Sequence, residues 1–236
     1  EVDTQLPAKA SAVPLPDDFT AVFKAVKFSR FNRVKAFDFT LPDNACVRVQ
    51  GDPISLKWLA ELLRGNYQPD TGLITLGGID NLEIDRQSLR EAIKVIDRVT
   101  LLPMSISSYL DLFVSADSAH SKQQALTALG LDEEIARLHK GLGAKLSRSG
   151  WPLTQPQAIR LKLASALLAR PRLLVLGDIV DSVELDVMEK VIALLRQQGT
   201  TILYFTKRQD LTNFSHTLEI DAQSQRLTEY AGGVVA

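Results

Sequence analysis

Two runs of consecutive apolar residues in the C-terminal half constrain the fold more than any other feature. They are RLLVLG, residues 172–177, and TTILYF, residues 200–205. A strand with no polar face is buried on both sides, as in parallel sheets that are covered by helices. Amphipathic helical patterns precede the two runs: TQPQAIRLKLASALLA before the first and VELDVMEKVIALLRQQ before the second. This alternation of helices and strands predicts an α/β fold with a parallel sheet.

The N-terminal half shows a different, two-residue periodicity. In FTAVFKAVKF and KAFDFTL, apolar residues approximately alternate with polar ones, which puts Phe37, Phe39 and Leu41 on one side. This period predicts half-buried antiparallel strands. GLITLGG, residues 72–78, predicts another short strand, and DRQSLREAI predicts a helix with Asp85 as its N-cap.

Residues 105–142 change in character and predict several short helices. SISSYLDLF, SKQQALTALGL and DEEIARLHKGL follow one another, with Ser121 and Asp132 as capping candidates. We therefore expect an all-helical insertion between the two α/β parts of the chain.

Composition excludes several classes of function. The 236 residues contain 27 Lys and Arg against 28 Asp and Glu, so no basic excess favours nucleic acid as a partner. Cys46 is the single cysteine, which excludes a disulfide framework and a cysteine metal site. No apolar stretch reaches the length of a membrane span. Residues 1–18 have the proline-rich composition of a linker, and a start at Glu1 suggests a piece of a longer protein.

The segment CVRVQGDPISLKW, residues 46–58, is strand-like and leads through a turn at Gly51 into a helix. The helix has an apolar face made by Leu56, Leu59, Ala60 and Leu63. Taken alone, this segment is most simply a Gly-Asp-Pro turn into an amphipathic helix, with the lysine in solvent and the tryptophan packed.

Three longer stretches are similar to one family. They are LLRGNYQPDTGLITLGGIDNLEIDRQSLREAI, SGWPLTQPQAIRLKLASALLARPRLLVLGD and TTILYFTKR. In order and spacing they resemble the nucleotide-binding domain of ATP-binding cassette (ABC) transporters, particularly exporters, over about residues 20–231. The resemblance implies an ABC-type P-loop NTPase fold with a parallel core sheet, an N-terminal antiparallel β subdomain and an inserted helical subdomain. The implied division is a linker over 1–18, a core with the antiparallel strands over 19–98 and 158–236, and the helical subdomain over 99–157.

The phosphate-binding loop of that family, G-x-x-x-x-G-K-[ST], wraps phosphate oxygens with backbone N–H groups and needs its glycines to do so. Here Gly51 and Lys57 remain, but the inner glycines fall on Ile54 and Leu56, and Trp58 replaces the hydroxyl that holds Mg²⁺. The resemblance therefore implies a refolded loop. The cofactor-binding candidates that it implies are Gly51, Ser55, Lys57, Trp58, Phe31, Arg98 and Gly177.

The positions that perform chemistry in the family also depart from its pattern. Asp178 takes the place of the catalytic glutamate, Gly177 that of the metal-supporting aspartate, and Lys207 that of the switch histidine. The Q-loop glutamine falls on Asp97 or Arg98. Asp178 and Lys207 are thus catalytic candidates at degenerate positions, expected to be inactive, and no metal site is expected.

The stretch in place of the family's L-S-G-G-Q signature also starts a helix. It consists of Leu153, Thr154, Gln155, Pro156 and Gln157. Thr154 keeps a hydroxyl, whereas Pro156 lacks a donor and Gln155 fills space that glycine leaves open. As a plain helix start, the same stretch has a good N-cap and a proline in the first turn.

These observations favour a pseudo-ATPase domain of an exporter-like membrane protein, with no cofactor expected and ATP with Mg²⁺ as the alternative. Asp178 is predicted to pair with Lys57 or Lys207, against the alternative that both lysines stay in solvent. A slow ATPase with a rearranged site and a scaffold that binds a protein partner remain open. The resemblance implies a transmembrane domain and a second ABC nucleotide-binding domain as partners, at the cytoplasmic face of a membrane.

Overall fold

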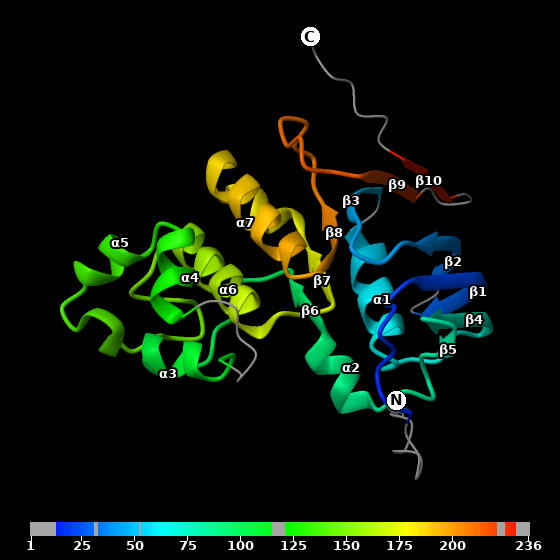
Figure 1. Cartoon of the computed structure of the whole chain (residues 1–236), viewed down its shortest axis with the longest axis horizontal. Coiled ribbons are helices and arrows are strands. Elements are labelled where there is room, and N and C mark those ends of the chain that lie inside the picture. The colour runs from blue at the N-terminus through cyan, green and yellow to red at the C-terminus, as the bar shows by residue number, and fades with distance from the viewer. Residues whose placement is uncertain (1–12, 31–32, 52, 115–120, 221–224, 230–236) are drawn as a thin grey trace.

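The computed structural model describes residues 13–30, 33–51, 53–114, 121–220 and 225–229. Its strands form two sheets, and its helices lie around and beside the larger one (Figure 1). The strands are β1 Ala21–Arg30, β2 Arg33–Leu41, β3 Cys46–Gly51, β4 Thr71–Leu76, β5 Ile79–Asp80, β6 Ile93–Ile96, β7 Leu173–Leu176, β8 Thr201–Phe205, β9 His216–Ile220 and β10 Gln225–Glu229. The α-helices are α1 Pro53–Leu63, α2 Arg86–Ala92, α3 Ile106–Asp111, α4 Lys122–Ala128, α5 Asp132–Ala136, α6 Gln155–Ala169 and α7 Leu185–Gln197, and the 3₁₀ helices are η1 Gly141–Gly143 and η2 Asp178–Ser182.

The larger sheet has the strand order β10-β9-β3-β8-β7-β6. All neighbours pair in parallel except β10, which runs antiparallel to β9 at one edge. The four residues of β7 and the five residues of β8 are buried, as their continuous apolar sequences predict. The predicted parallel sheet is therefore confirmed.

The smaller sheet is antiparallel, with the order β2-β1-β4-β5. Phe37, Phe39 and Leu41 are buried on one face, as the alternation predicts, and Phe39 stacks on Phe23 with ring centroids 4.6 Å apart. This face shares a hydrophobic core with α1. The antiparallel strands therefore hold α1 from the side opposite to the parallel sheet.

Helices α3, α4 and α5 gather with α6 at the end of the molecule opposite to the smaller sheet (Figure 1). Ser121 caps α4 in a capping box with Gln124, as predicted. The prediction that Asp132 caps the next helix is wrong. Leu131 holds the cap position, and Asp132 is the first helical residue, where its charge still complements the helix dipole.

Residues 13–18, the described part of the segment expected to be a linker, lie against the domain. Val13 exchanges backbone hydrogen bonds with Glu83 and Asp85, at 2.9 and 3.1 Å. Leu15 packs against the hydrophobic core that includes α1. The strand that follows therefore enters the smaller sheet from a fixed point beside α2.

Candidate functional site

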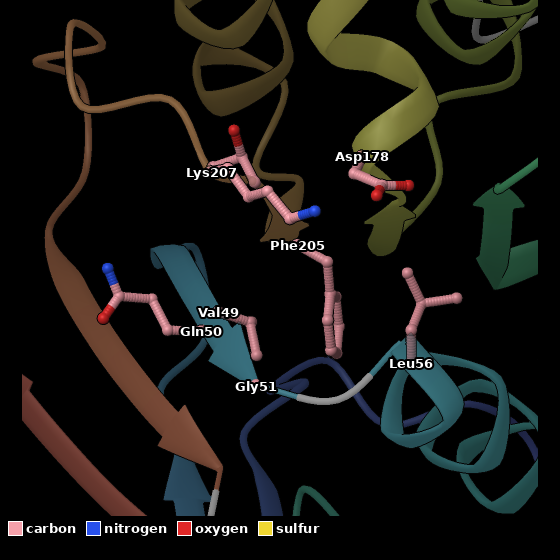
Figure 2. Close-up of a pocket in the computed structure, with 8 residues that line it drawn as sticks. Val49, Gln50, Gly51, Leu56, Asp178, Phe205 and Lys207 are labelled. Carbon is pink, nitrogen blue, oxygen red and sulfur yellow. The ribbon is translucent and has the colours of Figure 1, made fainter.

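A cavity of about 390 Å³ opens where β3 and β8 end. Parallel strands point their carboxyl ends to the same edge of a sheet, where α/β proteins commonly bind ligands. The lining residues are Val49, Gln50, Gly51, Leu56, Asp178, Phe205, Thr206 and Lys207. We call this space the strand-end cavity. In Figure 2, the side chains of Val49, Phe205 and Leu56 lie on one side of it and those of Asp178 and Lys207 on the other.

The ion pair predicted for this cavity does not form. Asp178 and Lys207 are both exposed, and the ion pairs of the described residues include none between Asp178 and either Lys207 or Lys57. An exposed pair contributes only about 0 to 1 kcal/mol, which does not outweigh the side-chain freedom that two long groups lose. The alternative from the sequence, lysines free in solvent, describes the structure.

Gly51 has a backbone reason to be glycine. Its φ is +154°, and a Cβ at this position would lie 2.5 Å from the carbonyl oxygen of Ile220 in β9. The glycine thus permits the close approach of two paired strands. This reason is independent of any phosphate group.

Helix α1 includes the residues that would correspond to the inner part of a phosphate loop. It runs from Pro53 to Leu63, and a proline suits a first helical turn. Successive helical residues point about 100° apart, so Leu56 and Lys57 face different surroundings. Leu56 lines the strand-end cavity, whereas Lys57 lines a different one. The lysine candidate is therefore separated from Gly51, although the two are close in sequence.

The other two candidates on α1 are buried. Ser55 is fully buried, and its hydroxyl has no hydrogen-bond partner among the described residues. Trp58 is 6% exposed and packs edge-on against Phe28, with ring centroids 5.2 Å apart at 84°. The tryptophan thus fastens α1 to the smaller sheet.

The second cavity, of about 250 Å³, lies beside α1, β6 and α6 and is called the cationic cavity below. Its lining residues are Lys57, Ala60, Glu61, Arg64, Val95, Asp97, Arg98, Thr100 and Lys162. Arg98 donates two hydrogen bonds of 3.0 Å to Asp97. Burial raises the pKa of Asp97, but the hydrogen bonds from Arg98, together with the positive charges of Arg98 and Lys162, lower the pKa by more, so that its net shift is downward. The structure thus brings the candidates Lys57 and Arg98 together, away from Asp178 and Lys207.

Gly177 follows β7 and precedes Asp178, and it is not among the residues that line the strand-end cavity. Its N–H donates to Ile96, and a Cβ here would come within 3.3 Å of Asp97 Cα. Phe31, another of the cofactor-binding candidates, lies outside the described residues.

The signature-like stretch begins α6. Leu153 is buried and Thr154 is the N-cap, in a capping box with Gln157, while Pro156 lies in the first turn. Gln155 is the first helical residue. The stretch therefore forms a helix start with a capping box and a proline in the first turn, as its sequence alone predicts.

Sequence reasoning missed Asp181, which organises the rim of the strand-end cavity. Its carboxylate accepts hydrogen bonds from the Tyr204 hydroxyl at 2.7 Å, the Thr206 hydroxyl at 2.6 Å and the backbone N–H of Lys207 at 3.3 Å. Burial and then the carboxylate raise the pKa of Tyr204. No periodic signal marks a single aspartate in a short 3₁₀ helix, but its place in the segment that follows a buried strand could have drawn attention to it.

The described residues contain no cluster of side chains suited to hold a metal ion. Among them, no helix has both the length and the apolar character needed to cross a bilayer.

No protein-family model matches the chain. The lactococcin-A transport/processing ATP-binding protein LcnC of Lactococcus lactis is 29% identical over 171 residues, 71% of this chain and 24% of that protein. The human mitochondrial iron-sulfur clusters transporter ABCB7 is 26% identical over 204 residues, 83% of this chain and 27% of its own. A probable multidrug resistance ABC transporter protein of Bacillus subtilis, YheI, is 27% identical over 217 residues, 88% of this chain and 37% of that protein. The chain thus spans between about a quarter and somewhat over a third of these relatives.

A solved structure, a bacterial Atm1-family ABC exporter with ATP bound, aligns with a TM-score of 0.80 at 19% identity. The alignment covers 94% of this chain and 41% of that one. The architecture is therefore that of an ABC-type P-loop ATPase domain. Within that class the chain is similar to the nucleotide-binding domains of ABC exporters, which confirms the resemblance seen in the sequence.

Proposed function

We propose that the chain is the nucleotide-binding-like domain of an ABC exporter-like membrane protein and that it does not hydrolyse ATP. Its role is structural or regulatory: it keeps the shape and interfaces of a motor domain without turnover. The resemblance to exporters supports the first part of this proposal. The second part depends on the geometry of α1.

The helical state of residues 53–63 is the observation on which the loss of hydrolysis depends. A phosphate loop directs consecutive N–H groups into one cradle. In a helix, every N–H after the first turn is directed along the axis to a carbonyl four residues back. Pro53 has no N–H at all, and Lys57 lines the cationic cavity. The strand-end cavity therefore lacks two parts of the family's phosphate cradle: the run of loop N–H groups and the lysine.

The strand-end cavity also fails to fit Mg²⁺. Magnesium prefers an octahedral set of oxygen ligands. The family's two metal-holding positions are here Gly177, which has no side chain, and Trp58, which packs against Phe28. Leu56 and Phe205 add an apolar wall. Loss of the metal and of a positioned base each removes a large part of the rate enhancement of an ATPase.

We propose partners of the same kind as those of the relatives: a transmembrane domain, on the same or another chain, and a second ABC nucleotide-binding domain. A position at the cytoplasmic face of a membrane follows from that assignment. The proposed division of the chain keeps residues 1–18 as the connection to the membrane domain, 19–98 and 158–236 as core and 99–157 as helical subdomain.

Equilibrium binding of labelled ATP with Mg²⁺, together with phosphate release, tests the loss of activity. We expect a dissociation constant weaker than about 1 mM and no phosphate release above that of buffer. Micromolar binding overturns the proposal. Phosphate release that Lys57→Ala abolishes also overturns it, in favour of a slow ATPase with a rearranged site.

The full-length reading frame separates the exporter assignment from a free-standing scaffold. Membrane-spanning helices encoded next to this domain support the assignment. A complete protein without them, and with no membrane protein encoded beside it, supports the scaffold.

A further inference from the structure

The cationic cavity contains more positive than negative side chains. Four cations, Lys57, Arg64, Arg98 and Lys162, line it together with two carboxylates, Glu61 and Asp97. Both carboxylates have other partners: Asp97 receives two hydrogen bonds from Arg98, and Glu61 receives one of 2.8 Å from Asn66. The lining thus carries an excess of two positive charges.

Two of the cations are held in place by backbone carbonyls. Arg64 donates from Nε and Nη2 to the carbonyl oxygen of Ile93, at 3.1 and 2.9 Å. Lys162 donates from Nζ to the carbonyl oxygen of Arg98, at 2.6 Å. Neither of these two side chains is in an ion pair with an acid in the described part of the chain. The positive groups are thus fixed before any ligand arrives, which lowers the entropic cost of binding.

Arg64 and Lys162 lie where nearby acids do not fully compensate for the burial of their positive charges. Burial lowers the pKa of Arg64 and the pKa of Lys162, and in neither case does the attraction of nearby acids compensate for it. A group whose charged form is penalised in this way gains when an anion approaches.

We propose that the cationic cavity binds a compact dianion, either a phosphate group or a pair of carboxylates. Arg64 and Lys162 form the charged floor, and the exposed Lys57 reaches the ligand from the mouth. A volume of about 250 Å³ holds an ion of this size with some water, since liquid water occupies about 30 Å³ per molecule. The proposal is independent of the loss of ATP hydrolysis, because Asp178 and Lys207 line the other cavity.

The test is isothermal titration of the full chain with inorganic phosphate, succinate and acetate at constant ionic strength. We expect at least one of the two dianions to bind with a dissociation constant on the order of 1 mM, and acetate to bind at least about fivefold more weakly. Phosphate binding alone points to a phosphate group, and succinate binding alone to paired carboxylates. If neither binds, or acetate binds equally well, the proposal is wrong.

Single substitutions of lysines test whether the anion binds in the cationic cavity. Lys162→Gln is expected to weaken it about tenfold, since a hydrogen bond to a charged group is lost. Lys57→Gln is expected to weaken it about threefold, because an exposed charge is screened by solvent. Lys190→Gln, an exposed lysine on α7, is the matched control and is expected to leave binding unchanged. Circular dichroism checks that each variant folds. If Lys162→Gln does not fold, Lys57→Gln still provides a test, because the exposed side chain of Lys57 makes no hydrogen bond to a described residue. Equal binding by Lys57→Gln and the control overturns the placement.

Discussion

The hydroxyl of Tyr204 donates a hydrogen bond of 2.7 Å to the carboxylate of Asp181. Tyr204 is in β8, and Asp181 is in the 3₁₀ helix that follows the neighbouring strand β7. Thr206 donates to the same carboxylate oxygen at 2.6 Å. These two partly buried hydrogen bonds therefore connect the two segments that place Asp178 and Lys207 at the strand-end cavity.

Replacing Asp181 by alanine should destabilise the fold. The Tyr204 and Thr206 hydroxyls would lose their common acceptor, at a cost of about 2 to 3 kcal/mol, whereas Tyr204→Phe removes one donor and should cost about 1 kcal/mol. Urea unfolding measures both. Asp70→Ala, at an exposed aspartate, is the control and should change the unfolding free energy by less than about 0.5 kcal/mol. A similarly small effect of Asp181→Ala would contradict the role given to this contact.

The pair of Arg160 and Glu134 should be sensitive to loss of the acid. Arg160 has 8% of its side chain exposed, and its Nη2 donates to both carboxylate oxygens of Glu134, at 2.9 and 2.8 Å. Glu134→Gln leaves the buried guanidinium with one acidic partner, Glu184, whose carboxylate is 4.0 Å from Nε and whose side chain is 57% exposed. We expect a loss of about 2 kcal/mol in unfolding free energy, below the value for a fully buried pair because Glu134 is 28% exposed.

The neighbouring glutamate supplies the control for that experiment. Glu133 pairs with Arg137 on the same helix face, but both side chains are at least 75% exposed. Glu133→Gln should therefore cost no more than about 0.5 kcal/mol. Equal effects of the two substitutions would refute the argument from burial.

Gly51→Ala should destabilise the junction of β3 and β9. The new methyl group would meet the Ile220 carbonyl, and alanine disfavours the positive φ, so we expect a loss of about 2 to 3 kcal/mol. Gly78→Ala is the matched control: its φ is also positive, at +82°, but nothing lies within 4 Å of the added Cβ. The difference between the thermal unfolding midpoints of Gly51→Ala and Gly78→Ala measures the effect of the steric clash with Ile220. No difference would mean that the strands can separate at little cost.

The thiol of Cys46 should make the protein less stable at high pH. Burial raises the pKa of Cys46 from 9.0 to about 12. Above pH 9.0 the unfolded chain loses this proton while the folded protein keeps it, so unfolding releases a proton and stability falls as pH rises. The stability that depends on the protonated Cys46 thiol is fully present below pH 9.0. It is lost between pH 9.0 and about pH 12, at about 1.4 kcal/mol of unfolding free energy per pH unit.

Urea unfolding of the protein and of Cys46→Ala at pH 8, 9 and 10 measures this slope. Tyr204 also lowers the stability at higher pH, because its pKa is raised as well. Both proteins contain Tyr204, so its effect cancels in the difference between their unfolding free energies. The native thiol should also resist thiol reagents until the protein unfolds. Parallel pH profiles for the two proteins would count against the assignment.

The strands of strong periodicity could be predicted from sequence, and the short or edge strands could not. Strands β7 and β8 are continuous apolar runs, and Phe37, Phe39 and Leu41 alternate cleanly, so tertiary contacts reinforce what the local pattern favours. Strand β6 was missed because its four residues, IKVI, directly continue a helical pattern. Strand β9 alternates over five residues, HTLEI, with a weaker apolar content, and it too was missed.

The site was harder to predict because it depends on where one helix begins. A change of one residue in the start of α1 would turn Lys57 by about 100°, from one cavity to the other. Sequence spacing does not fix such a start to within a residue. The predicted pairing of Asp178 failed for a related reason: alignment places residues at the same edge of a sheet but does not decide the direction of exposed side chains.

Trp58 couples the packing of the core to the candidate site. Its indole fills the space between α1 and Phe28, so a serine or threonine at this position would open a hole in the core, at a cost of about 3 to 5 kcal/mol. Under the proposed loss of hydrolysis, a substitution that supplies a hydroxyl here would therefore weaken the fold without giving activity, because Ile54 and Leu56 stand where the family has glycines. On that proposal, an inactive site of this kind is harder to leave than to enter.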